Sequence, residues 1–495
     1  MGSNAVATQA HMTAEELRAA AERRDTRIML WLILALGTFL RLRALQAKSF
    51  WLDEIASIVI ARMPGNSFWH WLWTDEGNMA LYYVMLRPWL QIHLGEATVR
   101  LLSVIPGIAS IPVIYLLGRR LFGRGTGLLA ALLLAISTCA VVYSQEARGY
   151  SWLVLGTIAS TYFFVRLIGR PTYAMALAYA LAAGVTFYFH YFGLLVPVAQ
   201  AVSLIALPAT RRPLRQLYVS AVLLAVLAAP VLWMIHIQPG RHLDWVARPS
   251  LLELYHLGVF LAAESGKGVG PVLLALDLVL IGLFLCAMLA AKRKSSGSGA
   301  GLWPYALVAS CLVTPIVLSV LVSIVRPVFF HRFLIICLPA WIIATAVGAN
   351  AIAKLRWKVA AIVAVCALSL VGTALSYSRM REDWRGVVNY LIDNARSHDV
   401  VLYYRGVGHF AAENYRDWMP GGAANRPLGI EVGAPAVDWR SRLQGAHRVW
   451  LVEYPANVSD ETSRAVEAEL HSRFTAVGSR PFRAITLTEF AAKQQ

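Results

Sequence analysis

Charged residues are scarce in this chain of 495 residues. Only 15% of the residues are Asp, Glu, Lys or Arg, whereas 58% are hydrophobic. The mean hydropathy of +0.57 is far higher than the core of a soluble domain requires. The composition therefore excludes an ordinary soluble protein and predicts a polytopic membrane protein.

Cysteine and known cofactor motifs are also missing or rare. The five cysteines all lie inside apolar runs, which argues against a disulfide framework. The sequence has no Walker motif, no dinucleotide-binding glycine pattern and no Cys/His spacing typical of a metal site. We therefore predict no definite cofactor, and a divalent cation held by acidic residues stays an open alternative.

The apolar residues form about eleven runs, each close to the ~20 residues that a helix needs to cross the hydrocarbon core. These runs lie near residues 28–46, 98–118, 126–143, 151–168, 173–190, 191–208, 217–236, 269–291, 302–325, 333–353 and 358–377. The predicted fold is therefore an α-helical polytopic membrane protein with about eleven transmembrane helices.

The connections between the runs alternate in charge. Five short ones are basic: "GRRLFGRG", "RLIGRPTY", "ATRRPLRQ", "AKRKSSGSG" and "KLRWK". The positive-inside rule assigns them to the cytoplasm, together with the N-terminal segment 1–27. The net charge of +17 therefore indicates topology and not nucleic-acid binding. The first outward loop, about 47–97, is rich in Trp and Tyr and predicts an amphipathic helix at the interface.

An odd number of spans places the tail, residues 378–495, on the outer side of the membrane module 28–377. Its composition changes to that of a soluble domain. "REDWRGVVNYLIDNARSHDVVLYYRG" predicts an amphipathic helix followed by a strand, and "HRVWLVEYP" predicts a second strand. We expect a small extracytoplasmic α/β domain that supports the membrane module and does not carry the chemistry.

Two adjacent carboxylates follow the first span, Asp53 and Glu54 in "FWLDE". Acids at this position have three explanations: a solvated helix start, worth ~0.3–1 kcal/mol, a structural ion pair with an arginine, or a reactive site. Acids and cations gathered on one face of a helical bundle suit the transfer of a group from an anionic leaving group. Other polar residues of the outward segments are Gln145, Glu146, Arg148, Tyr150, His190, His331 and Arg332.

Several motifs together resemble a known family. "FWLDE", "LYYVMLRPWL", "VRLLSVIPGIASIPVIYLLGRRLFGRGTGLLAALLLAIS", "YSQEARGYS", "HYFGLLV" and "EDWRGVVNYL" resemble, in order and spacing, the bacterial polytopic glycosyltransferases of the GT-C superfamily. These are related to the protein O-mannosyltransferases and to the lipid A aminoarabinose transferase. The resemblance covers roughly residues 28–400. Where many relatives have His-Pro-Pro before paired tyrosines, this chain has Asn78 and Met79, with Tyr82 and Tyr83 retained.

The resemblance implies a cell-envelope enzyme of the bacterial inner (plasma) membrane. It would move a sugar from a polyprenyl-phosphate donor to an acceptor hydroxyl on the periplasmic or extracellular face. The acceptor would be a lipid, a glycan or a protein; membrane lipids are the other expected partners, and nucleic acid is not. By the same resemblance, Asp53 is the catalytic acid/base. Of the tyrosines, Tyr82, Tyr83 and Tyr150 are substrate-binding candidates.

The chemistry of the leaving group leads to the same residue. A lipid phosphate leaves readily, so cations should suffice there, and the acceptor hydroxyl needs a base. We expect Asp53 to take that proton in a single inverting displacement, with Glu54 orienting it or holding the loop. Glu146 is the second candidate acid, and an ion pair with Arg148 is its equal alternative.

The cationic candidates are open to a simpler explanation. Arg148, His331 and Arg332 are candidate phosphate contacts, although arginines near helix ends more often meet lipid headgroups. His190 is more often a satisfied interface histidine, but it lies at the outer end of a span.

Two other functional classes stay open. A transporter or flippase of lipid-linked sugars also has many spans with polar groups. However, the sequence has no clear inverted repeat, and its polar groups gather at one membrane face. A scaffold whose outer domain binds partners would leave Asp53 dispensable.

Overall fold

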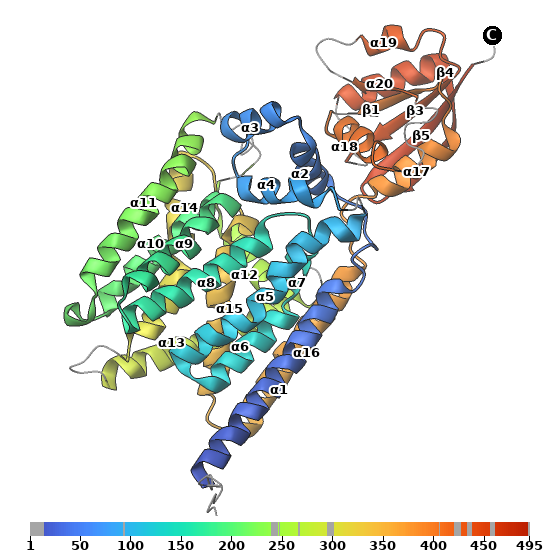
Figure 1. Ribbon diagram of the computed structural model, residues 1–495. Coiled ribbons are helices and arrows are strands. Elements are labelled where there is room, and N and C mark those ends of the chain that lie inside the picture. The colour runs from blue at the N-terminus through green and yellow to red at the C-terminus, as the bar shows by residue number, and fades with distance from the viewer. Residues whose placement is uncertain are drawn as a thin grey trace, which may run out of the picture.

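The computed structural model describes residues 14–493, apart from 93–94, 239–245, 247, 266–267, 295–300, 405, 420–426, 433–437 and 456–460. Part of the basic loop 291–299 therefore lies outside the described residues. A bundle of helices forms the larger part of the molecule, and a smaller domain with a sheet sits at one end of it (Figure 1).

Among the described residues, seven helical segments are long and apolar enough to cross a membrane. An eighth is added if α6 and α7, which meet at an angle of 55°, count as one broken span. These segments are α5 (Glu96–Phe122), α6 (Arg124–Ile136), α7 (Thr138–Ser144), α8 (Tyr150–Gly169), α11 (Leu214–Ile237), α13 (Gly270–Lys294), α14 (Trp303–Val325), η5 (His331–Cys337) with α15 (Leu338–Ala351), and α16 (Leu355–Tyr377).

The other predicted runs are helical as well, but they do not meet this standard. The helix α1 (Ala14–Leu42) has charged residues at both ends, and α9 (Tyr173–Phe189) is 17 residues long. The run 191–208 is broken into shorter pieces. These pieces are η1 (Tyr191–Leu194), α10 (Leu195–Ser203) and η2 (Leu204–Ala206), followed by η3 (Ala209–Arg211).

Burial separates a central span from peripheral ones. In the most apolar stretch of η5 and α15, 94% of the residues are buried. In the corresponding stretches of α11, α13, α14 and α16, only 22–28% of the residues are buried. Large apolar side chains such as Leu232, Val322 and Val363 are exposed on these outer helices. An apolar exterior suits contact with lipid, because lipid tails offer no hydrogen-bond partners.

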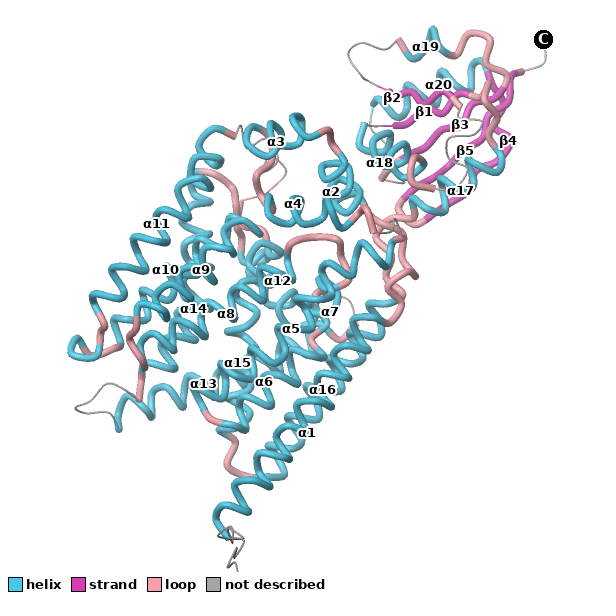
Figure 2. The backbone as a smooth tube through the Cα atoms, in the orientation of Figure 1, coloured by secondary structure: helices cyan, strands magenta, loops and turns pink. Residues whose placement is uncertain are grey.

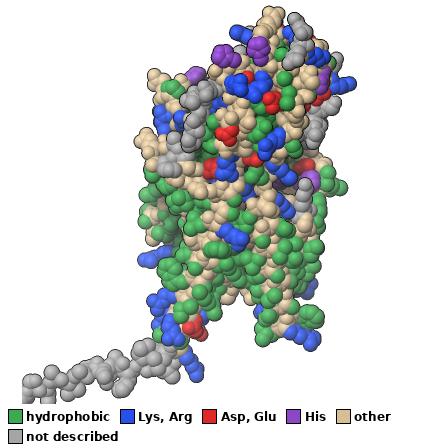
Figure 3. Space-filling model, turned by 90° about the vertical axis from the view of Figure 1, so that its right-hand side faces the viewer, with side chains coloured by type: hydrophobic (Ala, Val, Ile, Leu, Met, Phe, Trp, Pro, Cys, Tyr) green, Lys and Arg blue, Asp and Glu red, His purple; other side chains and the backbone are tan. Residues whose placement is uncertain are grey.

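The two ends of the bundle differ. The beginning of α1 and the connections α5–α6, α8–α9 and α15–α16 lie at one end, and the sheet domain lies at the other (Figure 2). In the space-filling view, Lys and Arg side chains gather along the lower border of a wide hydrophobic band (Figure 3). Three of the basic connections that the sequence assigns to one side therefore share one end of the molecule.

The first outward loop contains three short helices where the sequence predicts one interfacial helix. They are α2 (Leu52–Arg62), α3 (Gly65–Thr74) and α4 (Ala80–Trp89). On α3, Phe68 and Leu72 are buried while Trp69 and Trp73 are exposed. The amphipathic character is confirmed, but turns break the loop so that its helices cover the end of the bundle. A further short helix, α12 (Leu251–Ala263), follows α11.

The tail forms the α/β domain that the sequence predicts. Its sheet has the strand order β2-β1-β3-β5-β4. Strand β1 pairs in parallel with β2 and β3, and β5 pairs antiparallel with β3 and β4. The elements are α17 (Trp384–Asn394), β1 (Val400–Tyr404), α18 (Gly406–Arg416), β2 (Leu428–Val432), α19 (Trp439–Arg442), β3 (Arg448–Glu453), α20 (Glu461–Arg473), β4 (Phe474–Phe482) and β5 (Ile485–Ala492).

The predicted helix and both predicted strands correspond to α17, β1 and β3. The five residues of β1 are all buried, since helices and neighbouring strands cover them, and this explains their continuous apolar run.

Candidate active site

The adjacent carboxylates Asp53 and Glu54 occupy the first turn of α2 and have different environments. Neighbouring residues of a helix project about 100° apart, so the two side chains cannot share one environment. The Glu54 side chain is 1% exposed, whereas that of Asp53 is 30% exposed. Of the two carboxylates, Asp53 is the one that a substrate can reach.

Glu54 forms a buried ion pair with Arg100, in the first turns of α5. Arg100 donates from Nε to Oε1 and from Nη2 to Oε2, both at 2.8 Å. The backbone amides of Ala147 and Trp51 donate to the same two oxygens, at 2.8 and 3.3 Å. Glu54 therefore takes the structural ion-pair role, and it joins the start of α2 to α5 and to the 145–149 turn.

Asp53 faces two arginines from distant parts of the chain. Arg332 donates from Nη1 to Asp53 Oδ2 at 3.0 Å, and Arg148 Nη2 lies 4.0 Å from the same oxygen. Arg332 comes from η5 at the outer end of the central span, and Arg148 comes from the turn between α7 and α8. The predicted acid and two predicted phosphate contacts are thus brought together.

The paired tyrosines of α4 lie behind Arg148. The Arg148 Nη1 atom donates to Tyr83 Oη at 3.4 Å and to Ser57 Oγ at 3.2 Å. Tyr82 contacts Ser103 Oγ at 3.3 Å, and Ser103 donates to the Arg148 carbonyl at 2.9 Å. Both tyrosines are fully buried, and burial raises the pKa of both phenols. Their contacts hold Arg148 in place.

The histidine candidates and Tyr150 belong to an aromatic cluster beside this centre. The ring of His190 lies 4.9 Å from that of Phe333 and 5.9 Å from that of Tyr150. His190 Nδ1 accepts a hydrogen bond from the Phe192 amide at 3.1 Å. His331 packs against Phe330, with 4.3 Å between ring centroids. These ring contacts pack the cluster together beside the arginines.

Residue Asn78, which stands at the place of the relatives' His-Pro-Pro, has a definite structural contact. Its Oδ1 atom accepts a hydrogen bond from the Tyr191 amide at 3.0 Å. Asn78 therefore ties the first outward loop to the turn after α9, next to the aromatic cluster. The neighbouring Met79 is fully buried.

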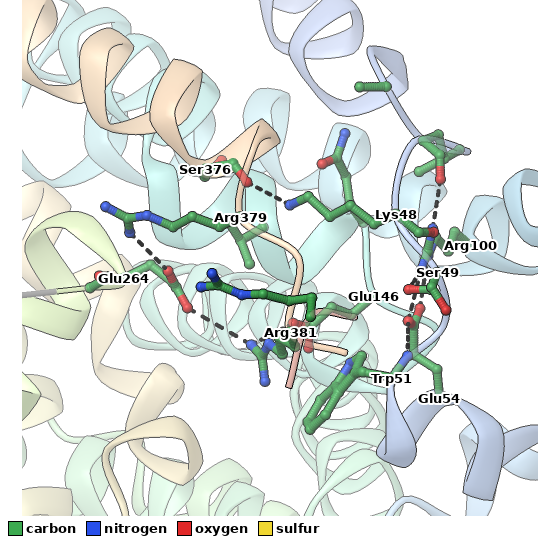
Figure 4. A pocket seen from close by; sticks show the side chains of 16 residues that line it. Lys48, Ser49, Trp51, Glu54, Arg100, Glu146, Glu264, Ser376, Arg379 and Arg381 are labelled. Carbon is green, nitrogen blue, oxygen red and sulfur yellow. Dashed lines mark hydrogen bonds and ion pairs between the residues drawn. The ribbon is translucent and has the colours of Figure 1, made fainter. Parts of the chain in front are cut away.

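A polar cavity of about 260 Å³ adjoins this centre, and Trp51 is part of its wall. The guanidinium of Arg381 lies 4.1 Å from the centroid of the Trp51 ring, and that of Arg332 lies 4.9 Å from it. Figure 4 shows Lys48, Glu146, Glu264 and Arg381 around the cavity. Trp51 therefore contacts both the guanidinium that binds Asp53 and a guanidinium of the cavity.

Glu146 lines this cavity, and its partner differs from the one expected. Its Oε1 atom forms an ion pair with Arg381 Nη2 at 2.6 Å. The alternative in which Glu146 pairs with Arg148 is therefore wrong, because the Arg148 guanidinium has its partners at Asp53, Ser57 and Tyr83. Burial raises the pKa of the Glu146 carboxyl, and the Arg381 charge opposes that rise.

An apolar groove of about 310 Å³ lies beside the aromatic cluster. Its wall is formed by η1, α10, the end of α11 and the end of α14, with Leu195, Ile235 and Val322 among its residues. Phe192 also lines the groove, and its ring lies 5.4 Å from that of Phe333. The groove therefore adjoins the aromatic cluster at Phe192.

The C-terminal domain reaches α2, the helix that carries Asp53, through Glu382. The amide of Leu52, the first residue of α2, donates to Glu382 Oε2 at 2.9 Å. Trp384 and Tyr454 also donate to this buried carboxylate, at 2.5 and 2.7 Å. The start of α2 is therefore fixed by a side chain of the tail.

Some of these residues escaped the sequence-based prediction. Trp51 and Glu382 lie in motifs that carry the family resemblance, "FWLDE" and "EDWRGVVNYL", so those motifs were the available signal. No local sequence pattern marks Lys48, Glu264 and Arg381 as neighbours, because only the folded chain brings them together. Among the described residues, no three His, Cys, Asp or Glu side chains are placed to hold a metal ion together.

Comparison with known proteins gives a consistent result for the fold. Residues 81–235 match the family model described as dolichyl-phosphate-mannose-protein mannosyltransferase. Curated proteins gave no match to the chain.

The structure is similar to that of ArnT from Cupriavidus metallidurans, with TM-scores of 0.61 for the apo state and 0.60 for the state bound to undecaprenyl phosphate. Both matches have 14% identity and cover 92% of this chain and 97% of ArnT.

Two further structures share the architecture. The arabinofuranosyltransferase AftD from Mycobacteria has a TM-score of 0.53 at 12% identity, over 96% of this chain and 40% of AftD. The archaeal oligosaccharyltransferase AglB from Archaeoglobus fulgidus, in complex with an inhibitory peptide and a dolichol-phosphate, has a TM-score of 0.51 at 12% identity, over 87% of this chain and 69% of AglB. The predicted fold class is confirmed: this membrane protein has the GT-C fold.

Proposed function

We propose that this protein is a glycosyltransferase that moves a sugar from a polyprenyl-phosphate donor to an acceptor hydroxyl, with Asp53 as the base. One observation carries the proposal. A partly exposed carboxylate lies 3.0 Å from the half-buried Arg332 and 4.0 Å from the buried Arg148, at the end of the bundle opposite the basic connections. The match to the mannosyltransferase family model supports the reaction class.

The apolar groove supports a lipid-linked donor. A polyprenyl tail would lie along Leu195, Ile235 and Val322, with its phosphate directed past Phe192 and Phe333. Arg332 and Arg148 would then receive the phosphate, since guanidinium groups bind phosphate oxygens well. The structure of ArnT bound to undecaprenyl phosphate adds support, because its fold is similar.

The displacement follows from these positions. The acceptor oxygen attacks the anomeric carbon and forms the new glycosidic bond. The bond from that carbon to the phosphate oxygen breaks, and its electron pair leaves with the lipid phosphate. Arg332 and Arg148 stabilise the charge that develops there, while Asp53 takes the hydroxyl proton. A single displacement of this kind inverts the anomeric configuration.

The arginines that bind Asp53 in this structure would turn toward the phosphate once the donor is present. Their departure frees the carboxylate oxygens of Asp53 to accept a hydrogen bond from the acceptor hydroxyl. The positive-inside rule further supports a site on the periplasmic or extracellular face of a bacterial plasma membrane.

The test uses purified protein with a panel of polyprenyl-phosphate sugars and measures release of the lipid phosphate. We expect Asp53→Asn to lower the transfer rate by ~10²–10⁴ fold, the usual contribution of a general base, because the amide keeps the shape and removes the base. Asp75→Asn, in the same outward loop, is the control and should keep the wild-type rate.

Two results would contradict this proposal. Near-wild-type turnover by Asp53→Asn would remove Asp53 from the mechanism and direct attention to Glu146. Movement of the donor across vesicles without release of lipid phosphate would identify a flippase. The anomeric configuration of the product, measured by NMR, tests inversion separately.

A further inference from the structure

The polar cavity beside Trp51 has no role in the displacement described above. Asp53 is not among its lining residues. Its wall comes from six parts of the chain: the 44–54 segment, Arg100 of α5, the end of α7 with the turn after it, the end of α12, the 376–381 segment, and Arg483 beside β5. Such a converging set of charged side chains is typical of a binding site.

The cavity has an excess of positive charge. Arg100 and Glu54 neutralise each other as a bidentate pair. The other charged residues of the wall are Lys48, Arg379, Arg381, Arg483, Glu146 and Glu264. Cations therefore outnumber carboxylates by two within this set, which favours an anionic ligand.

Glu146 gives the second, independent observation. Its side chain is 8% exposed, and its Oε2 atom is buried without a hydrogen-bond partner among the described residues. A buried acceptor left in this way costs ~1–3 kcal/mol, and more when it is charged. A ligand hydroxyl in the cavity could donate to Oε2 and remove that cost.

The size of the cavity limits what it can hold. A volume of about 260 Å³ is slightly below the ~300–1,000 Å³ of drug-sized ligand sites. The cavity therefore suits a sugar or a lipid headgroup and not a whole lipid. Its wall also includes Trp51, which contacts Arg332 and so adjoins the partner of Asp53.

We propose that this cavity binds the acceptor, and that the acceptor carries both hydroxyl groups and a phosphate. The inference rests on the proposed function, because it assigns the second substrate of the same reaction. Lys48 and Arg381 bind the phosphate, and Glu146 Oε2 accepts a hydrogen bond from a hydroxyl. A second hydroxyl of the acceptor extends past Trp51 and reaches the Asp53 carboxylate.

The experiment follows the reactivity of Lys48 and does not need catalysis. Burial lowers the pKa of the Lys48 amine to about 8, so a large share of it is neutral and nucleophilic at pH 8. Purified protein in phosphatidylcholine nanodiscs is treated with an acylating reagent, and the modified lysines are quantified by mass spectrometry. Exposed Lys354, at the opposite end of the molecule, is the internal control.

Glycerol 3-phosphate is the soluble probe, with glycerol and inorganic phosphate as matched compounds. We expect glycerol 3-phosphate to slow Lys48 modification at least ~10-fold at saturation, a differential binding of about 1.4 kcal/mol, with Lys354 unchanged. Nanodiscs containing phosphatidylglycerol test the lipid source. Protection by the lipid alone assigns a lipid headgroup, and protection by the soluble probe alone assigns a free phosphorylated acceptor; both support the site.

Variants separate this site from the proposed mechanism. Arg381→Gln and Glu146→Gln should each abolish protection, while Asp53→Asn should keep it. An active Asp53→Asn enzyme with intact protection would overturn the mechanism and leave the cavity assigned. Absent protection by all probes, protection unaffected by both cavity variants, or equal protection by glycerol or by inorganic phosphate would overturn the acceptor assignment.

Discussion

Replacing Glu54 with Gln should destabilise the protein strongly, although its neighbour Asp53 can be replaced at little cost to folding. Each carboxylate oxygen of Glu54 accepts two hydrogen bonds: Oε1 from Arg100 and Ala147, and Oε2 from Arg100 and Trp51. The Gln amide group must take one of these two positions, and there its N–H groups meet two other donors. Arg100 also keeps a buried charge without its counterion.

The expected magnitude follows from these contacts. Breaking a buried ion pair by removing one partner costs ~3–5 kcal/mol. Asp53 is 30% exposed, and its amide could still accept the hydrogen bond from Arg332, so we expect Asp53→Asn to change the free energy of unfolding by less than ~1 kcal/mol. The two neighbouring substitutions should therefore separate stability from catalysis.

The assay is thermal unfolding of the purified variants in one detergent, combined with donor turnover. A double-mutant cycle with Glu54→Met and Arg100→Met provides the control, since removing both charges should cost less than the sum of the single changes. An unchanged unfolding midpoint for Glu54→Gln would refute the ion-pair role. A catalytic loss in a Glu54→Gln protein that stays folded would assign Glu54 to the chemistry instead.

Two more predictions concern the domain contact and the topology. Glu382→Gln should lower kcat with little change in the donor KM, because the Leu52 amide loses a charged acceptor at the start of α2. Tyr454→Phe should have the same effect in weaker form. Equal activity of both variants and wild type would argue against a role of Glu382 in positioning α2. In a background without native cysteines, a membrane-impermeant thiol reagent added to intact cells should label Ser397→Cys and not Gly125→Cys, and the reverse pattern would invert the topology.

The helices of the membrane module could be predicted from the sequence because ~20 apolar residues in a row have few alternatives in a bilayer. The break between α6 and α7 was not visible in that pattern, since Ser137 is compatible with an unbroken apolar run. In the structure, Arg41 of α1 donates to the carbonyls of Leu134 and Ala135 near this break, at 3.1 and 2.9 Å. These hydrogen bonds come from a neighbouring helix, so the local sequence pattern around the break does not reveal them.

The site could be predicted only in part for the same reason. Asp53 was found because it is adjacent to Glu54 at a predicted membrane boundary and lies in a motif of the resemblance. Which of the two acids pairs with an arginine depends on how α2 packs against α5. The pairing of Glu146 with Arg381 joins residues that are far apart in the chain, and no local spacing indicates it.

The contact between Glu382 and the first residue of α2 also has a consequence for the order of biosynthesis. Glu382 follows the last membrane span, and Tyr454, which also binds it, lies in the second half of the tail. On the topology proposed above, a nascent chain therefore reaches the complete geometry at Asp53 only after the tail has crossed the membrane and folded. Partly made chains lack this support for α2 and, under the proposed function, would leave the pool of lipid-linked sugar intact.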